Sequence, residues 1–269
     1  MLQLTDRQKD IVKVALQAGR VTVEDLSTRF DVTPQTIRKD LNELCEAQVL
    51  KRTHGGAIIS SSVENAPYDA RRFFAAEEKR AIGRAAAAQI PNGSSLFINI
   101  GTTTECVAAA LTEHEQLLVI TNNLNVAMTL SSHPSIEVIV VGGSVRRIDR
   151  AVIGGQAVEM IRQFRVDYAI IGASALDEDG TLLDFDPQEV QVARAIIANS
   201  RRVLLACDHT KLDRSAPVRI AQMSEVHTFV TDRMPSARLR DVCASQRVTL
   251  IEALSQPAVP ADAVGVEGS

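Results

Sequence analysis

Apolar and polar positions alternate with the period of an α-helix over the first part of the chain. Thr5 and Gln8 have the spacing of a capping box, and Gly19 ends the helix that they open. A second short helix is predicted over Val23–Phe30, and a third begins at Pro34, where the missing N–H has no helical partner to lose. Two short helices joined by a tight turn indicate a helix-turn-helix.

The third helix separates an apolar face from a polar one. Ile37, Leu41 and Leu44 lie within about 60° of one another, so they face a core. The other side carries amide and basic side chains, which suit base edges and phosphates in a DNA major groove. Residues 49–58 then read as strand, basic turn and strand, the pattern of a wing. The predicted DNA-binding residues are Gln35, Thr36, Arg38, Lys39, Asn42, Lys51, Arg52 and His54.

An ordinary solvated helix face is the alternative to this reading surface, because charged helix faces are common. Asp40 lies near the buried edge of the helix, so we expect it to make an internal salt bridge or a cap rather than to contact DNA. His54 could contact a DNA phosphate, but a single histidine in a turn is more often an exposed polar residue without a binding role.

From about residue 74 the pattern changes to short apolar runs that alternate with helical stretches. Almost continuous apolar runs are typical of buried parallel strands, and their alternation with helices predicts a mostly parallel α/β sheet covered on both faces. The predicted strands are 96–100, 117–120, 136–141, 166–171 and 203–206, with 226–230 and 248–251 as further ones, and the helices are 77–90, 104–111, 126–131, 156–164 and 187–199.

These patterns divide the chain into two domains. Residues 1–59 are expected to form a winged helix-turn-helix, residues 60–73 a polar linker, and residues 74–254 an effector-binding α/β domain. The segment 255–269, rich in Pro, Ala, Gly and Val, is expected to be disordered.

Composition agrees with a globular protein of 269 residues and a net charge of −4. Every apolar run is shorter than the roughly 20 residues that a membrane helix needs, and the first residues lack the layout of an export signal. The four cysteines are scattered and form no Cys-x-x-Cys pair, so a reducing cytoplasm is the expected compartment. Lys and Arg exceed Asp and Glu by only nine to eight in residues 1–59, so the placement of charge carries the DNA-binding argument.

Glycine, hydroxyl, amide and charged side chains follow the predicted strands. Ligands bind beyond the carboxyl ends of parallel strands, so these side chains are expected at one rim. Gly101 and the helix that it precedes form an anion site of free N–H groups, which favours a phosphate with a short polyol. P-loop, Gly-x-Gly-x-x-Gly and metal-binding spacings are absent from the sequence, so no cofactor and no metal are expected. The predicted effector-binding residues are Gly101, Thr102, Thr103, Thr104, Glu105, Asn122, Asn123, Gly143, Arg146, Asp177, Asp208 and Lys211.

Several separate motifs resemble one family. Residues 33–41 (TPQTIRKDL) and 53–57 (THGGA) resemble the DNA-binding signature of DeoR-type repressors, and residues 100–105 (IGTTTE), 120–127 (ITNNLNVA) and 141–146 (VGGSVR) resemble their effector module. Residues 180–186, 189–190 and 208–211 continue the resemblance, which covers about residues 1–232.

The resemblance implies a winged helix-turn-helix joined to a domain like that of ribose-5-phosphate isomerase. It also implies a homo-oligomer, either dimer or tetramer, that binds double-stranded operator DNA of a carbohydrate or polyol catabolic operon. A phosphorylated metabolite would release the DNA, with glycerol 3-phosphate as the expected ligand. Asn99 stands where the family often has Asp, and Arg150 stands where Gly commonly follows Asp149, so both positions bear on ligand choice.

Two other functions remain open at this point. A sugar-phosphate isomerase could use Glu105, Asp177, Asp208 and Lys211 as acid–base groups. The predicted winged helix-turn-helix of residues 1–59 would then have no function in the reaction. An interaction adaptor would leave the rim empty. We expect a regulator without a catalytic residue.

Overall fold

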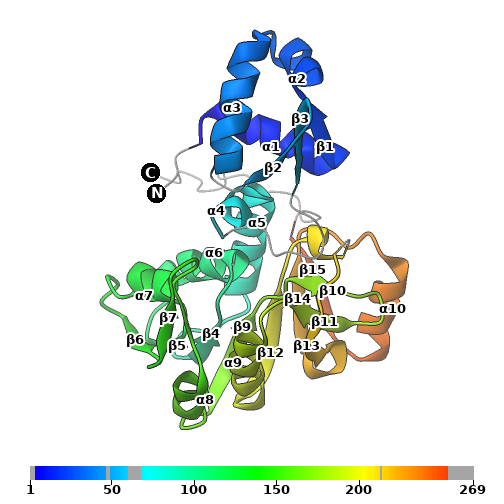
Figure 1. Cartoon of the computed structure of the whole chain (residues 1–269). Helices are drawn as coiled ribbons and strands as arrows, with labels where there is room; N and C mark the ends of the chain where they lie inside the picture. Colours follow the sequence, from blue (N-terminus) through cyan, green and yellow to red (C-terminus); the bar gives the residue numbers. More distant parts are fainter. Residues whose placement is uncertain (1–3, 47–48, 60–67, 213, 254–269) are drawn as a thin grey trace, which may run out of the picture.

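The computed structural model describes residues 4–46, 49–59, 68–212 and 214–253, which form a small amino-terminal domain seated above a larger α/β domain (Figure 1). Residues 60–67 of the predicted linker and the predicted disordered tail lie outside this description. No described helix is both long enough and apolar enough to cross a bilayer.

The amino-terminal domain, called the reader domain below, has the predicted winged helix-turn-helix architecture. The capping box of Thr5 and Gln8 opens α1, and Gly19 ends it in the left-handed conformation. The three strands pair antiparallel in the order β1-β3-β2, so β2 and β3 form the predicted wing. The elements are α1 (Asp6–Ala18), β1 (Arg20–Thr22), α2 (Val23–Phe30), α3 (Pro34–Glu46), β2 (Leu50–Thr53) and β3 (Gly56–Ile59).

The second domain is built on a seven-stranded sheet whose neighbours all run parallel, which confirms the predicted α/β class. Side chains of β4 alternate between its faces: Leu96 and Ile98 lie in one buried cluster and Phe97 in the other. In sheet order the strands are β15 (Thr249–Glu252), β14 (Thr228–Thr231), β12 (Ser200–Ala206), β9 (Val166–Ile171), β4 (Ser95–Ile98), β5 (Leu117–Thr121) and β6 (Ile136–Val140).

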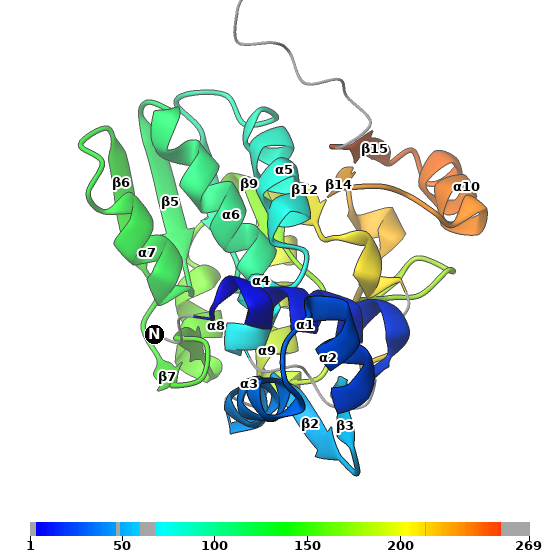
Figure 2. The same cartoon turned by 90° about the horizontal axis from the view of Figure 1, so that it is seen from above.

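Helices cover both faces of this sheet, which explains why its strands are almost continuously apolar. The first face is covered by α5, α6 and α7, and the second by α8, α9 and α10 (Figures 1 and 2). Their bounds are α5 (Ala76–Ala87), α6 (Thr102–Ala110), α7 (Leu124–Leu130), α8 (Gly155–Ile161), α9 (Pro187–Ala198) and α10 (Ala237–Ser245), with short 3₁₀ turns at Leu111–Glu113, His209–Lys211 and Met223–Glu225.

Smaller elements beyond the main sheet were not predicted from the sequence. An antiparallel hairpin joins β7 (Ser144–Arg146) to β8 (Ala151–Ile153). A second antiparallel sheet has the order β10-β11-β13, with β10 at Ala175–Leu176, β11 at Thr181–Asp184 and β13 at Val218–Gln222. These strands have two to five residues, too few to show a period against their surroundings.

The last six residues of the segment predicted as a linker, residues 60–73, are helical. Tyr68–Phe73 forms a helix, α4. Tyr68 is buried there and donates a hydrogen bond of 2.6 Å to Glu105. Six residues give fewer than two helical turns, so this helix depends on tertiary contacts that no local pattern reveals.

Candidate functional site

Helix α3 has one polar, exposed face and one apolar face that packs into the core of the reader domain. Ile37, Leu41 and Leu44 are fully buried in the core of the reader domain, as their spacing predicts. The side chain of Lys39 is 78% exposed. The remaining predicted DNA contacts on α3 and the wing are also exposed, except the half-buried Thr36: Gln35, Arg38, Asn42, Lys51, Arg52 and His54.

Two polar residues of α3, Asp40 and Thr36, make contacts within the reader domain. Asp40 is buried and forms an ion pair with Arg7 of α1 at 2.6 Å, which confirms the predicted internal salt bridge. The backbone N–H of Thr36 donates to the Thr33 hydroxyl at 3.3 Å, and the two hydroxyl groups lie 2.9 Å apart. Thr36 therefore belongs to the cap that starts α3, and its contact with DNA stays a prediction.

The second domain has a pocket at the point where the strand order reverses. From β4 the chain proceeds to β5 and β6 on one side, then crosses to β9, β12, β14 and β15 on the other. The loops after β4 and β9 thus separate above the sheet, which is where open α/β sheets bind ligands. The pocket there has an empty volume of about 500 Å³, including its open mouth. Its polar lining comprises Arg71, Asn99, Gly101, Thr102, Thr103, Thr104, Ser174, Asp184, Glu189 and Lys211.

One end of the pocket is suited to an anion. Gly101 has φ 146°, a conformation strained for any residue with a Cβ, and it has no side chain to cap α6. The first-turn N–H groups of α6 therefore lack a helical partner and carry the positive end of the helix dipole. The Thr104 hydroxyl is not free for a ligand, because it donates to the carbonyls of Asn99 and Gly101 at 2.7 and 2.8 Å and holds the loop.

Lys211 supplies a cation at the same end. It follows β12 in the His209–Lys211 turn, and only 9% of its surface is exposed. Burial lowers its pKa to about 7, with Asp208 opposing the shift and Arg214, Lys79 and Arg71 adding to it. Burial would raise the pKa of Asp208, but Lys211 and Lys79 outweigh it and hold that pKa below its usual value.

The lowered pKa of Lys211 makes anion binding depend on pH. Below about pH 7 the lysine is charged in the free protein, whereas above it a bound phosphate must draw a proton onto the lysine. The second pKa of a phosphate monoester is about 6, so the ligand gains no further charge in the upper range. We expect affinity for glycerol 3-phosphate, measured by calorimetry, to fall at least about tenfold from pH 6.5 to pH 9. A flat profile would contradict a titrating Lys211 at the site.

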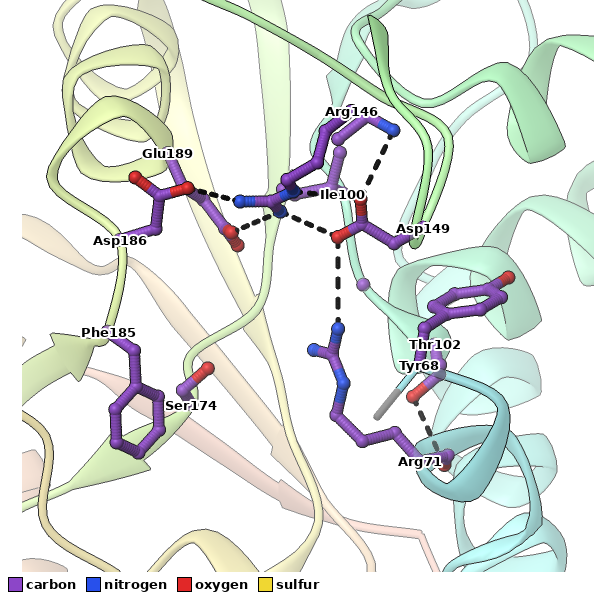
Figure 3. A network of polar contacts seen from close by, with 12 residues as sticks. Tyr68, Arg71, Ile100, Thr102, Arg146, Asp149, Ser174, Phe185, Asp186 and Glu189 are labelled. Carbon is purple, nitrogen blue, oxygen red and sulfur yellow. Dashed lines mark hydrogen bonds and ion pairs between the residues drawn. The ribbon is translucent and has the colours of Figure 1, made fainter. Parts of the chain in front are cut away.

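Arg146, a predicted ligand residue, is neutralised by carboxylates. It donates to Asp149 at 2.9 and 2.6 Å, to Glu189 at 2.6 Å, and to Asp186 (Figure 3). Although burial opposes it, the pKa of Arg146 is raised by Asp149 and Glu189. The network fixes the β7–β8 hairpin against the start of α9, and Glu189 links it to the pocket.

The remaining predicted residues lie outside the pocket lining, and their ligand contacts stay predictions. Glu105 accepts hydrogen bonds from Tyr68, Asn123 and Asn125. The Asn122 amide donates to the Val152 carbonyl at 3.2 Å. Gly143 is exposed at the entry to β7, Asp208 is buried next to the Lys211 turn, and Asp177 lies exposed in the β10–β11 turn.

The predicted effector-binding residues do not include four that line the pocket: Arg71, Ser174, Asp184 and Glu189. Ser174 and Asp184 come together because β11 folds back beside the loop after β9, and the serine donates to the aspartate at 3.0 Å. Arg71 lies in the segment that was expected to be a linker. The position of Ser174 directly after a predicted strand was a usable signal, whereas nothing local marks the other three.

Comparison with known proteins agrees with this two-domain arrangement. Residues 7–63 match the DeoR-like helix-turn-helix domain, and residues 75–233 match the DeoR C terminal sensor domain. The glycerol-3-phosphate regulon repressor of Escherichia coli (strain K12) is 45% identical over 93% of this chain and 99% of its own. That of Haemophilus influenzae is 48% identical over 85% of this chain and 89% of its own.

Among solved structures, ribose 5 phosphate isomerase A from Neisseria gonorrhoeae is 14% identical, with a TM-score of 0.38 over 51% of this chain and 53% of that chain. The sensor-domain match alone spans more than half of the 269 residues, and it follows the helix-turn-helix match in the order that the structure shows. The chain therefore belongs to the DeoR family of transcriptional repressors.

Proposed function

We propose that this chain is a DNA-binding repressor of a carbohydrate or polyol catabolic operon, and that a phosphorylated metabolite releases it from its operator. The main support for the proposal is the pocket, which is lined both by the start of α6, where no side chain caps the helix, and by the buried Lys211. Glycerol 3-phosphate is the proposed ligand, because two relatives at 45% and 48% identity are named as repressors of the glycerol-3-phosphate regulon.

The pocket suits the two chemical parts of such a ligand. Backbone N–H groups at Gly101–Thr104 and the Lys211 ammonium can bind a phosphoryl group. The carboxyl groups of Asp184 and Glu189 and the hydroxyl of Ser174 line the same pocket, and they can accept or donate hydrogen bonds with polyol hydroxyl groups. A phosphate attached to a short polyol engages both sets at once.

The reader domain supports the DNA-binding half of the proposal. Gln35, Arg38, Lys39 and Asn42 extend from the exposed face of α3, the helix that such folds place in the major groove. Lys51, Arg52 and His54 on the wing are positioned for the phosphate backbone. We infer that the chain acts in the cytoplasm as a homo-oligomer, dimer or tetramer, because paired readers can bind two operator half-sites.

Release follows if the ligand prefers the conformation with lower operator affinity. The coupling is reciprocal, so operator DNA must weaken ligand binding by the same factor as the ligand weakens operator binding. Typical couplings of about 1–3 kcal/mol correspond to changes of roughly 5- to 150-fold.

A gel-shift release assay tests the proposal on the full chain. A duplex is first selected from a random-sequence pool by its binding to the chain, and it is then titrated with glycerol 3-phosphate, other sugar phosphates and inorganic phosphate. We expect glycerol 3-phosphate to weaken DNA binding at least about fivefold and to raise the melting temperature of the free chain. If no duplex is selected, or if every phosphorylated compound leaves both measurements unchanged, the proposal is wrong.

An isomerase-like enzyme is less well supported by the geometry. Of the four residues considered for acid–base chemistry, only Lys211 lines the pocket. Glu105 is engaged with Tyr68 and two asparagines, and Asp177 is exposed in a turn. We propose that the chain has no catalytic residue. Turnover of a sugar phosphate by the purified chain would reverse this assignment.

A further inference from the structure

Arg71 has features of a ligand-binding residue that the site description so far does not use. It lines the pocket from α4, and its side chain is only 14% exposed. Its Nε is buried, and within the described part of the chain this atom has no hydrogen-bond partner. A buried donor of this kind lowers the free energy of the protein when an acceptor reaches it.

The acidic neighbour of Arg71 is already satisfied by another arginine. Asp149 lies 3.8 Å from an Arg71 terminal nitrogen, but it accepts two shorter hydrogen bonds, of 2.9 and 2.6 Å, from Arg146 (Figure 3). The Asp149–Arg71 contact is thus a long ion pair without a hydrogen bond, and the Arg71 Nε keeps its donor for another acceptor. A guanidinium in this condition is well suited to bind a phosphoryl group, because it can offer two parallel donors.

The backbone of Arg71 is attached to the anion end of the pocket. Its carbonyl accepts a hydrogen bond from the Thr102 hydroxyl at 3.5 Å, and a second one from the Lys79 ammonium. Lys79 also donates to the Phe74 carbonyl at 2.7 Å. The first turn of α6 is therefore in direct contact with α4.

The residues that follow Arg71 reach the other domain. Phe74 is 7% exposed and belongs to the buried core of the reader domain, together with residues of α1, α2 and α3. Phe73 is half-buried and packs against the same core. In both views α4 lies directly beneath the reader helices (Figures 1 and 2). Three positions along the chain thus separate a pocket-lining guanidinium from a core side chain of the reader domain.

We propose that Arg71 binds the phosphoryl group of the ligand and that α4 transmits this contact to the reader domain through Phe74. The inference rests on the proposed function and adds to it both a ligand-binding residue and the route to DNA release. When the phosphoryl group draws the Arg71 side chain from Asp149 toward α6, the short helix shifts with it. Phe74 then changes its packing under the reading helix, and the ligand favours that arrangement over the DNA-binding one.

Three variants of the full chain separate ligand binding from transmission. Arg71→Gln removes the guanidinium, and Arg72→Gln is its matched control, because Arg72 lies on the same helix, is exposed, and also stands 6.0 Å from the Tyr68 ring centroid. Phe74→Leu keeps an apolar side chain in the reader core but alters its shape. Glycerol 3-phosphate affinity is measured by calorimetry without DNA, and operator affinity by gel shift with and without saturating glycerol 3-phosphate.

We expect Arg71→Gln to weaken glycerol 3-phosphate binding about tenfold or more, while Arg72→Gln binds it as the wild type does. Phe74→Leu should bind the ligand within about twofold of the wild type, yet the ratio of its operator affinities without and with ligand should fall toward one.

Other results overturn the inference in distinct ways. Equal ligand affinity in Arg71→Gln and Arg72→Gln would remove Arg71 from the ligand site. An unchanged ratio in Phe74→Leu, with both operator affinities lowered equally, would show a purely structural role for Phe74. A wild-type chain that binds none of the phosphorylated probes would instead refute the proposed function itself, and this inference with it.

Discussion

Lys211→Met is expected to weaken glycerol 3-phosphate binding at least about 30-fold, because truncating one partner of a buried charge pair costs about 2–5 kcal/mol. Methionine keeps most of the length of the side chain but has no charge and no N–H group. Of the two basic side chains that line the pocket, Arg71 alone then remains for a dianion. Calorimetry at pH 6.5, where Lys211 is charged, gives the largest contrast with the wild type.

The controls for Lys211→Met separate lost binding from lost stability. Lys9→Met removes the same charge from α1 in the reader domain and should bind the ligand normally. Since Lys211 helps to hold Asp208 charged in a buried position, the variant should also melt at a lower temperature. Adding Asp208→Asn should restore the melting temperature without restoring ligand affinity. Wild-type affinity in the single variant would remove Lys211 from the site.

Local signals in the sequence were sufficient for most of the architecture. The Thr5–Gln8 capping box, the left-handed Gly19 and the spacing of Ile37, Leu41 and Leu44 each depend on residues within one or two helical turns. The buried parallel strands were predictable for a related reason, since a strand covered on both faces is apolar along its length. These features need no knowledge of distant contacts.

The anion end of the pocket was predictable because it follows from the order of strands. Gly101–Thr104 begin three residues after the end of β4, and Lys211 lies five residues after the end of β12. Residues beyond the carboxyl ends of parallel strands share one edge of the sheet. The same rule failed to bring Asp177 to the pocket. The chain turns into the β10–β11 hairpin after leaving the main sheet, and the direction of a hairpin is not encoded in distance along the sequence.

Residues that depend on long-range contacts were missed. Arg146 meets Asp186 and Glu189 across 40 and 43 positions, so its neutralisation could not be predicted from its neighbours. Arg71 belongs to a six-residue helix held by tertiary contacts, and the polar, proline-containing stretch before that helix had suggested a linker. The residue with the clearest potential to connect the two domains was therefore placed in a predicted linker.

The double variant Arg38→Ala/Lys39→Ala is expected to weaken operator binding at least about 30-fold, since specific base contacts contribute about 1–3 kcal/mol each and phosphate contacts add to them. Both side chains are exposed on α3, and Lys39 lies 3.9 Å from the Glu43 carboxylate. Their removal leaves Ile37, Leu41 and Leu44 in place, so the melting temperature should change little. Gel shifts at several salt concentrations give both the affinity and its salt dependence.

The salt dependence distinguishes a direct role from a general effect of charge. Each phosphate contact that is lost should reduce the slope of log affinity against log salt by about one. Arg162→Ala, an exposed arginine just after α8 in the sensor domain, lowers the positive charge of the chain without touching the reader domain. We expect that control to keep both the affinity and the slope of the wild type. Arg38 and Lys39 are the two basic residues of α3. If the double variant keeps the wild-type affinity and the wild-type slope, α3 is not the helix that reads DNA.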